Sequence, residues 1–171
     1  MLKELCLLNG ASGDERRVCD FIINEIKDYC KYSVDALGSI IAFKKGKAVP
    51  SKKVMLSAHM DEVGFIITHI TEDGYLKFHP VGGIDPRVVI DRVVQIGNIK
   101  GVIGAKAVHL LSDEEKKTVP DFSKLYIDIG AKSKEETEKY VSLGDFAYFS
   151  SDYSEFGNGF IKSKALDDRI G

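Results

Sequence analysis

Residues 54–64 read VMLSAHMDEVG, and this stretch decides the fold. Its first half, residues 54–58, is an uninterrupted run without charge, which suits a strand buried on both faces of a parallel sheet beneath helices. The polar residues after it would lie at the C-terminal end of that strand, where open α/β sheets place their sites. The stretch therefore predicts an α/β unit with a candidate site just beyond residue 58.

The segment before this strand reads as the start of the same α/β unit. Ser12 stands three residues before Glu15, the spacing of a capping box, and an apolar stripe at helical spacing follows. Two β-like runs come next, at residues 32–35 and 40–43. One helix can cover only one face of a buried strand, so the α/β part reads as unfinished.

From Gly64 the sequence changes to short strands at the spacing of a small all-β unit. Ser133 and Glu136 form a second capping box and predict one helix there. The expected strands are 65–70, 75–78, 88–96, 99–103, 108–111, 125–129 and 145–150. This pattern is typical of a domain inserted into another, and it predicts domains at 1–64, 65–150 and 151–171. The third stretch reads as the truncated start of a second α/β segment.

Composition narrows the class of protein. The chain has 171 residues, of which 44% are hydrophobic and 29% charged, enough apolar material for a packed core. A net charge of −2, without long blocks of one sign, argues against nucleic acid or a membrane surface as a partner, and no apolar run is long enough for a membrane helix. The N-terminus is unlike a secretory signal, so a cytoplasmic location is expected. The three cysteines are expected to be free packing residues.

His59 and Asp61 form the first candidate site. Two residues apart in an extended chain, their side chains project to the same side. A histidine beside a carboxylate can provide a metal ligand and a group that orients it. The same pair could equally hydrogen-bond to loop backbone at a strand end, and the spacing alone leaves both interpretations open.

Asp167 and Asp168 form the second candidate site. Two adjacent carboxylates can hold a cation, and one of them can bridge two metals. Aspartate before a helix also caps it, and on spacing alone capping is the more common role. Taken together, the two candidate sites strengthen each other.

Four segments carry a resemblance to a known family. Residues 7–15 resemble its opening, a Leu-rich turn followed by Ser-Gly and Glu, and residues 35–41 resemble its D-x-x-G-N-x-I/V segment, with Ser39 in place of the usual Asn. Residues 58–65 and 164–171 are close to its H-x-D-E-x-G-F and A-x-D-D-R-x-G motifs. The sequence thus resembles the N-terminal portion of an M42 metallo-aminopeptidase, of the tetrahedral and glutamyl aminopeptidase group, some once labelled endoglucanases.

The resemblance implies a fold and an activity. The fold is α/β, a partial mixed-sheet catalytic domain interrupted by an inserted β-barrel-like dimerisation domain, which in the complete family builds hollow homo-oligomers such as dodecamers. The activity is the removal of N-terminal residues from short peptides, with two divalent metal ions (Zn, Co or Mn) that activate a water molecule.

The resemblance also implies roles for individual residues. His59 would be a ligand of one metal, and Asp167 would be the carboxylate that bridges both. Asp61 would be the catalytic-site acid that sits beside the metals and orients a ligand. Asp168 would lie behind the ligands, and its peptide bond to Asp167 is expected to be cis.

The family places further site residues after its D-D-R motif: an adjacent Glu pair, an Asp and a final His. The sequence ends at Gly171, so the chain alone is expected to be catalytically incomplete and inactive. Other candidates do not substitute for them. The pairs 114–115 and 135–136 read as solvated acids, and the remaining histidines read as structural or surface residues, namely His69, His79 and His109.

Two other functions stay open at this point. A non-catalytic assembly module would explain the missing Glu pair, but it would not require His59, Asp61 and Asp167. A carbohydrate-active hydrolase would need two catalytic carboxylates along a sugar-binding groove, and a sequence without Trp shows no aromatic platform for one. The peptidase is the favoured hypothesis.

Overall fold

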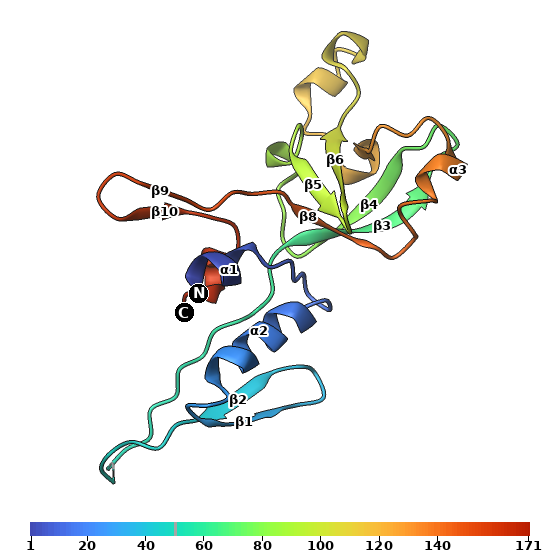
Figure 1. Cartoon of the computed structure of the whole chain (residues 1–171). Coiled ribbons are helices and arrows are strands. Elements are labelled where there is room, and N and C mark those ends of the chain that lie inside the picture. The colour runs from blue at the N-terminus through green and yellow to red at the C-terminus, as the bar shows by residue number, and fades with distance from the viewer. Residues whose placement is uncertain (50) are drawn as a thin grey trace. The chain divides into compact units, whose positions relative to one another are not determined.

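The computed structural model describes residues 1–49 and 51–171, which divide into two compact units (Figure 1). The split unit joins the two ends of the chain, Met1–Glu62 and Ser151–Gly171. The barrel unit is the continuous stretch Val63–Ser150. The chain is thus a mixed α/β protein in which one unit is assembled from two separate segments of sequence.

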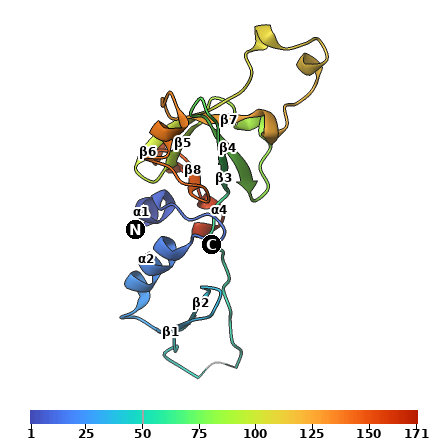
Figure 2. The same cartoon turned by 90° about the vertical axis from the view of Figure 1, so that its right-hand side faces the viewer.

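The barrel unit is a closed barrel of six antiparallel strands (Figure 2). Around the barrel the strands run in the order β3-β4-β7-β6-β5-β8, and β8 pairs with β3 to close it. The register shifts between Ile67 and His69 of β3, a β-bulge that bends the strand. The strands are β3 (Gly64–Ile70), β4 (Leu76–Val81), β5 (Val93–Ile96), β6 (Ile99–Gly104), β7 (Tyr126–Asp128) and β8 (Phe146–Phe149).

Inward-facing residues of these strands fill the barrel with one apolar core. In β3, Phe65 and Ile67 are buried, whereas His69 beyond the bulge is exposed. The ring centroid of Phe65 lies 4.9 Å from that of Phe78 and 5.1 Å from that of Phe149. The other buried members of the core are Ile70, Leu76, Val89, Val94, Ile96, Ile103, Leu125, Ile127, Val141 and Ala147. Burial of these side chains gives the barrel unit a hydrophobic core of its own.

Short helices connect the strands. The Ser133 side chain accepts a hydrogen bond from the Glu136 amide and caps α3 (Lys134–Thr137), so the predicted start of this helix is confirmed. The start of α3 packs against the turn between β3 and β4, where Gly74 has φ +86° and a Cβ would lie 3.0 Å from the Ser133 carbonyl oxygen, so that turn needs glycine. The 3-10 helices are η1 (Pro86–Val88), η2 (Val108–Leu110), η3 (Glu115–Lys117) and η4 (Phe122–Lys124).

Two predicted strands of this unit differ in the structure. Residues 108–111 contain η2 instead of a strand, because so short an apolar run takes its conformation from whether a neighbouring strand pairs with it. Only the second half of the predicted strand 88–96 is extended. Asp85 accepts a hydrogen bond from the Arg87 amide and starts η1, which delays the strand to Val93.

The split unit contains small elements. α2 (Arg16–Ile26) and the antiparallel pair β1 (Lys31–Val34) and β2 (Ile40–Phe43) match the predicted helix and strands. α1 (Leu2–Leu7) has no counterpart among the predicted elements, since six residues are too few to show helical periodicity. The remaining elements are β9 (Ser154–Phe156), β10 (Phe160–Lys162) and α4 (Leu166–Arg169). None of the described helices is long and apolar enough to cross a membrane.

The uncharged run at residues 54–58 is not a buried strand, and that prediction is wrong for the described chain. The run pairs with no strand, and Met55 and Leu56 are 88% and 90% exposed. A strand buried on both faces needs hydrogen-bonded neighbours and a covering layer on each side. The described strands of the split unit form two-stranded antiparallel hairpins instead, so the predicted parallel sheet is not formed by these residues.

One prediction concerns Asp85 and Arg87 of the barrel unit. The side chain and amide of Arg87 both donate to the Asp85 carboxylate and lower its pKa to about 2. Replacing Arg87 with Met is expected to raise this pKa toward the ordinary 3.8 without reaching it, because the amide still donates. NMR titration of the Asp85 carboxyl carbon measures the change. Arg92→Met is the matched control, since that guanidinium donates to the Val88 carbonyl instead, and equal shifts in both variants would contradict the assignment.

Candidate metal centre

His59 lies between two carboxylates. Its Nδ1 is 2.9 Å from Asp61 Oδ1, and its Nε2 is 3.1 Å from Asp167 Oδ1. His59 and Asp61 belong to the irregular segment before β3, whereas Asp167 belongs to α4, 108 positions from His59. The structure therefore brings together the two candidate sites that the sequence singled out.

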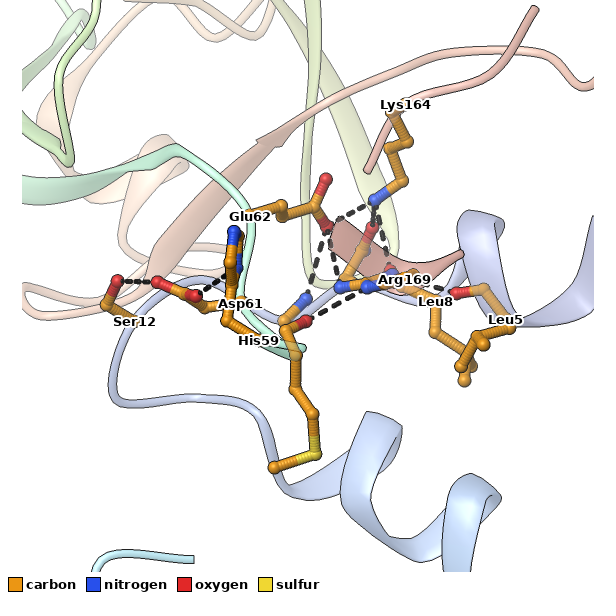
Figure 3. Close-up of polar contacts among 11 residues, drawn as sticks. Leu5, Leu8, Ser12, His59, Asp61, Glu62, Lys164 and Arg169 are labelled. Atoms are coloured by element: carbon orange, nitrogen blue, oxygen red, sulfur yellow. Dashed lines mark hydrogen bonds and ion pairs between the residues drawn. The ribbon is translucent and has the colours of Figure 1, made fainter. Parts of the chain in front are cut away.

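Asp61 is held by Ser12 as well as by His59 (Figure 3). The Ser12 hydroxyl donates to Asp61 Oδ2, and this bond together with the one from His59 lowers the pKa of Asp61. The predicted capping role of Ser12 is wrong, because Glu15 occupies the N-cap position of α2 and no side chain caps that helix. A hydrogen bond to an ionised carboxylate is roughly twice as strong as one between neutral groups, which favours Ser12 in its observed place.

The carboxylate of Asp61 also fixes the tautomer of the histidine. An ionised carboxylate only accepts hydrogen bonds, so the Nδ1 of His59 must carry a proton and donate it. In the neutral ring Nε2 is then the atom with a free lone pair, and it faces Asp167. A metal-binding histidine is commonly oriented in this way by a carboxylate on its other nitrogen.

The two carboxylates are expected to keep His59 protonated to higher pH than a free histidine. Desolvation lowers the pKa of His59, but the hydrogen bonds with Asp167 and Asp61 raise it by more, so the net pKa lies above 6.5. In the metal-free chain, NMR titration of the ring should show this raised value, and Asp61→Asn should lower it. His69→Ala is the control, because it removes an exposed histidine from another unit. An Asp61→Asn variant with an unchanged His59 pKa would refute the coupling.

Asp167 and Asp168 do not cap a helix. Ala165 occupies the N-cap position of α4, and both aspartates have non-helical backbone angles. Their peptide bond is cis, as the resemblance implied. The Asp167 side chain is 94% exposed, so its second oxygen is open to a further contact, whereas Asp168 is half-buried.

Three charged residues next to the site are buried, which the sequence did not predict. Glu62 accepts from Lys164 Nζ at 2.6 Å, and the side chain of Arg169 lies 3.7 Å from the same Glu62 oxygen (Figure 3). All three side chains are at least nine-tenths buried. Their position in the sequence could have indicated them, since each stands within three residues of a candidate metal ligand.

The donor atoms fit one divalent metal ion in part. Ligand atoms about 2.0–2.2 Å from a tetrahedral Zn²⁺ are about 3.3 Å from one another, close to the 3.1 Å between His59 Nε2 and Asp167 Oδ1. An imidazole and a carboxylate also have the chemistry that zinc, cobalt or manganese accepts. Among the described residues no three His, Cys, Asp or Glu side chains form a metal-binding cluster, so these two donors leave coordination positions to be filled.

The other candidate residues lie elsewhere. Glu115 accepts from the Ser112 amide and from Lys106, which together lower its pKa to about 2. Glu114, Glu135 and the remaining histidines, His69, His79 and His109, are exposed. The three cysteines are free, with Cys6 and Cys19 buried and Cys30 half-buried.

Comparison with known proteins places this geometry in a family. The sequence profile of the M42 glutamyl aminopeptidases matches residues 38–171. A lysyl aminopeptidase of Pyrococcus furiosus is 32% identical, over 99% of this chain and 51% of its own length. The chain spans about half the length of the curated relatives it matches.

Two solved structures resemble the whole chain. An endoglucanase from Thermotoga maritima is 46% identical with a TM-score of 0.84, over 99% of this chain and 50% of that one. The TET1 peptidase of Pyrococcus horikoshii, which can assemble into a tetrahedron or a large octahedral shell, is 42% identical with a TM-score of 0.83, over 98% of this chain and 51% of that one. The fold, the His59 and Asp167 motifs and the matching profile lead to one conclusion: the chain belongs to the M42 glutamyl aminopeptidase family.

Proposed function

We propose that the chain is the part of a dinuclear-metal aminopeptidase that holds one metal ligand and the carboxylate bridging both metals. The observation that carries this proposal is the 3.1 Å approach of His59 Nε2 to Asp167 Oδ1, two groups 108 positions apart that nothing in local sequence would bring together. Family membership and relatives named aminopeptidases support removal of N-terminal residues from peptides as the reaction.

Each side chain has a defined task in this proposal. His59 presents Nε2 as a ligand, and Asp61 holds the opposite ring nitrogen so that Nε2 keeps its lone pair. Asp167 lies beside His59 through one oxygen, and its exposed second oxygen would be free to hold a neighbouring metal ion. When bound, the two divalent ions would polarise the peptide carbonyl and lower the pKa of a water molecule.

The two units correspond to two roles in the proposal. The split unit would be the catalytic domain, which the sequence predicts at 1–64 and 151–171, and the barrel unit would be the inserted dimerisation domain, which the sequence predicts at 65–150. The assembly of the similar TET1 peptidase into a tetrahedron or an octahedral shell supports self-association of this chain, and the barrel unit is the part proposed to mediate it. Peptides are the expected substrates, and the cytoplasmic location stays a prediction.

The proposal includes catalytic incompleteness of the 171 residues taken alone. The described residues bring together two donors for metals that require four or five, and the relatives are about twice as long. Purified chain with added Zn²⁺ or Co²⁺ should therefore show no saturable hydrolysis of leucyl- or glutamyl-p-nitroanilide. Clear turnover by this chain would contradict the incompleteness and leave the family chemistry intact.

The metal site itself is tested by binding. Zn²⁺ titrated into the chain should shift the NMR signals of the His59 ring. In calorimetric titrations, His59→Ala should bind Zn²⁺ at least about 100-fold more weakly than the parent chain, because loss of an outer partner of a metal ligand already costs up to about that much. His69→Ala, at an exposed position of β3, should bind like the parent chain. A chain that self-associates but binds Zn²⁺ no better than His59→Ala would favour the assembly module over the peptidase.

A further inference from the structure

Next to the candidate metal site, the split unit buries a cluster of three charged side chains, those of Glu62, Lys164 and Arg169. Lys164 Nζ donates to Glu62 Oε1 and to Asn9 Oδ1, both at 2.6 Å, and to the Leu8 carbonyl at 3.3 Å. Glu62 Oε1 also accepts from the Gly10 amide at 3.2 Å. The cluster thus joins the N-terminal segment, the segment before β3 and the segment that contains α4.

Arg169 carries the contact that reaches the site. Its Nε donates to the carbonyl of Met60 at 2.9 Å, and Met60 is the residue between His59 and Asp61. Its Nη1 donates to the Leu5 carbonyl at 2.8 Å and also to that of Leu8. Arg169 itself follows Asp167 by two positions. Its side chain therefore connects the backbone next to both candidate ligands, His59 and Asp167, to the carbonyls of Leu5 and Leu8.

Burying these three charged side chains costs more desolvation free energy than burying apolar side chains of similar size would. Two cations share one buried carboxylate, and Arg169 Nη2 has no hydrogen-bond partner among the described residues. Replacing such a buried charge cluster with apolar side chains is often neutral or stabilising in other proteins. A gain in stability therefore does not explain this buried cluster. The planar guanidinium of an arginine, however, can donate to several carbonyls at once and so hold their backbone segments in a fixed geometry.

We infer that Arg169 is a positioning residue, which fixes the His59–Asp61 segment relative to Asp167 and so sets the distance between two metal-binding donors. Glu62 and Lys164 hold the Arg169 side chain in place by neutralising it and by fixing the Leu8–Gly10 backbone. The inference rests on the proposed metal site and adds residues that contact no metal. Outer partners of this kind typically alter metal affinity by about 10- to 100-fold.

Arg169→Lys tests the inference with the charge retained. An ammonium group can still neutralise Glu62, but it cannot donate to Met60, Leu5 and Leu8 in the fork geometry of arginine. Zn²⁺ titrations followed by the His59 ring signals should show about tenfold weaker binding than in the parent chain. The titrations are made at a temperature at which circular dichroism shows every variant to be folded.

Val18→Ala is the matched control. Val18 is fully buried in the same unit, but its apolar side chain cannot donate a hydrogen bond to the Met60 carbonyl as Arg169 does. It should lower the unfolding temperature and leave Zn²⁺ affinity unchanged. Equal affinity in Arg169→Lys and the parent chain would overturn the inference and leave the metal site standing. Equal losses in Arg169→Lys and Val18→Ala would also overturn it, since stability would then explain both. A parent chain whose His59 signals do not respond to Zn²⁺ would overturn the proposed function and this inference together.

Discussion

Glu62→Gln is expected to destabilise the split unit by about 3–5 kcal/mol. The substitution keeps the shape and the acceptor for the Gly10 amide but removes the only buried negative charge of the cluster. Lys164 and Arg169 would then lose the buried carboxylate that they share, and burial already lowers the pKa of both against the raising effect of Glu62. Removal of one member of a buried ion pair is strongly destabilising because it leaves the other member buried with less compensation.

Amide exchange resolves the effect by unit. In Glu62→Gln, the amides of α2 and the Gly10 amide should lose protection by the full free-energy change, while those of β3 and β6 should not. Glu72→Gln is the matched control, because Glu72 forms a loose 3.7 Å pair with Lys134 at the surface of the barrel unit. Such exposed pairs contribute less than about 1 kcal/mol. Similar losses in both variants would show that the Glu62 cluster contributes no more than a surface pair.

The two serine capping boxes show what local sequence can and cannot predict. Ser133 Oγ accepts from the Glu136 amide and caps α3, so at this helix the local pattern is sufficient. Ser12 has the same spacing to an acid, yet its hydroxyl donates to Asp61, 49 positions away. A local pattern shows only which hydrogen bonds a side chain can form with its neighbours in sequence. A bond to an ionised group that the fold brings close is stronger and can replace them.

The same contrast applies to the site as a whole. His59 and Asp167 could be proposed from motif residues, because their chemistry is unusual in combination. Glu62, Lys164 and Arg169 could not, because an acid, a lysine and an arginine normally remain at the surface, and their burial follows only from packing of distant segments. For residues 54–58 the sequence predicts burial, but burial also requires a neighbour that the described chain does not place there.

Phe65→Ala is expected to destabilise the barrel unit by about 3–5 kcal/mol, the usual cost of removing a fully buried aromatic side chain. The ring packs edge-on against Phe78 and Phe149, so the cavity would open at the centre of the core. Val102→Ala on the exposed face of β6 is the control and should cost less than about 1 kcal/mol. Exchange of the β3 and β6 amides measures both variants.

Unfolding of the barrel should also destabilise the candidate metal site, because the two segments that form the site would then be joined by a long flexible loop. In the folded barrel, β3 pairs with β8, Phe65 opposite Ala147, so the ends of the barrel unit are held together and the two segments of the split unit are joined across a short gap. Once the barrel unfolds, the same segments are connected by a flexible loop of roughly 90 residues, and closing it costs about 4 kcal/mol. Where Phe65→Ala unfolds the barrel, the Arg169 Nε–H bond to Met60 should therefore lose exchange protection, although no residue of the split unit has changed. Undiminished protection at Arg169 beside an unfolded barrel would show that the split unit holds its two segments together without the barrel, and that the site does not depend on it.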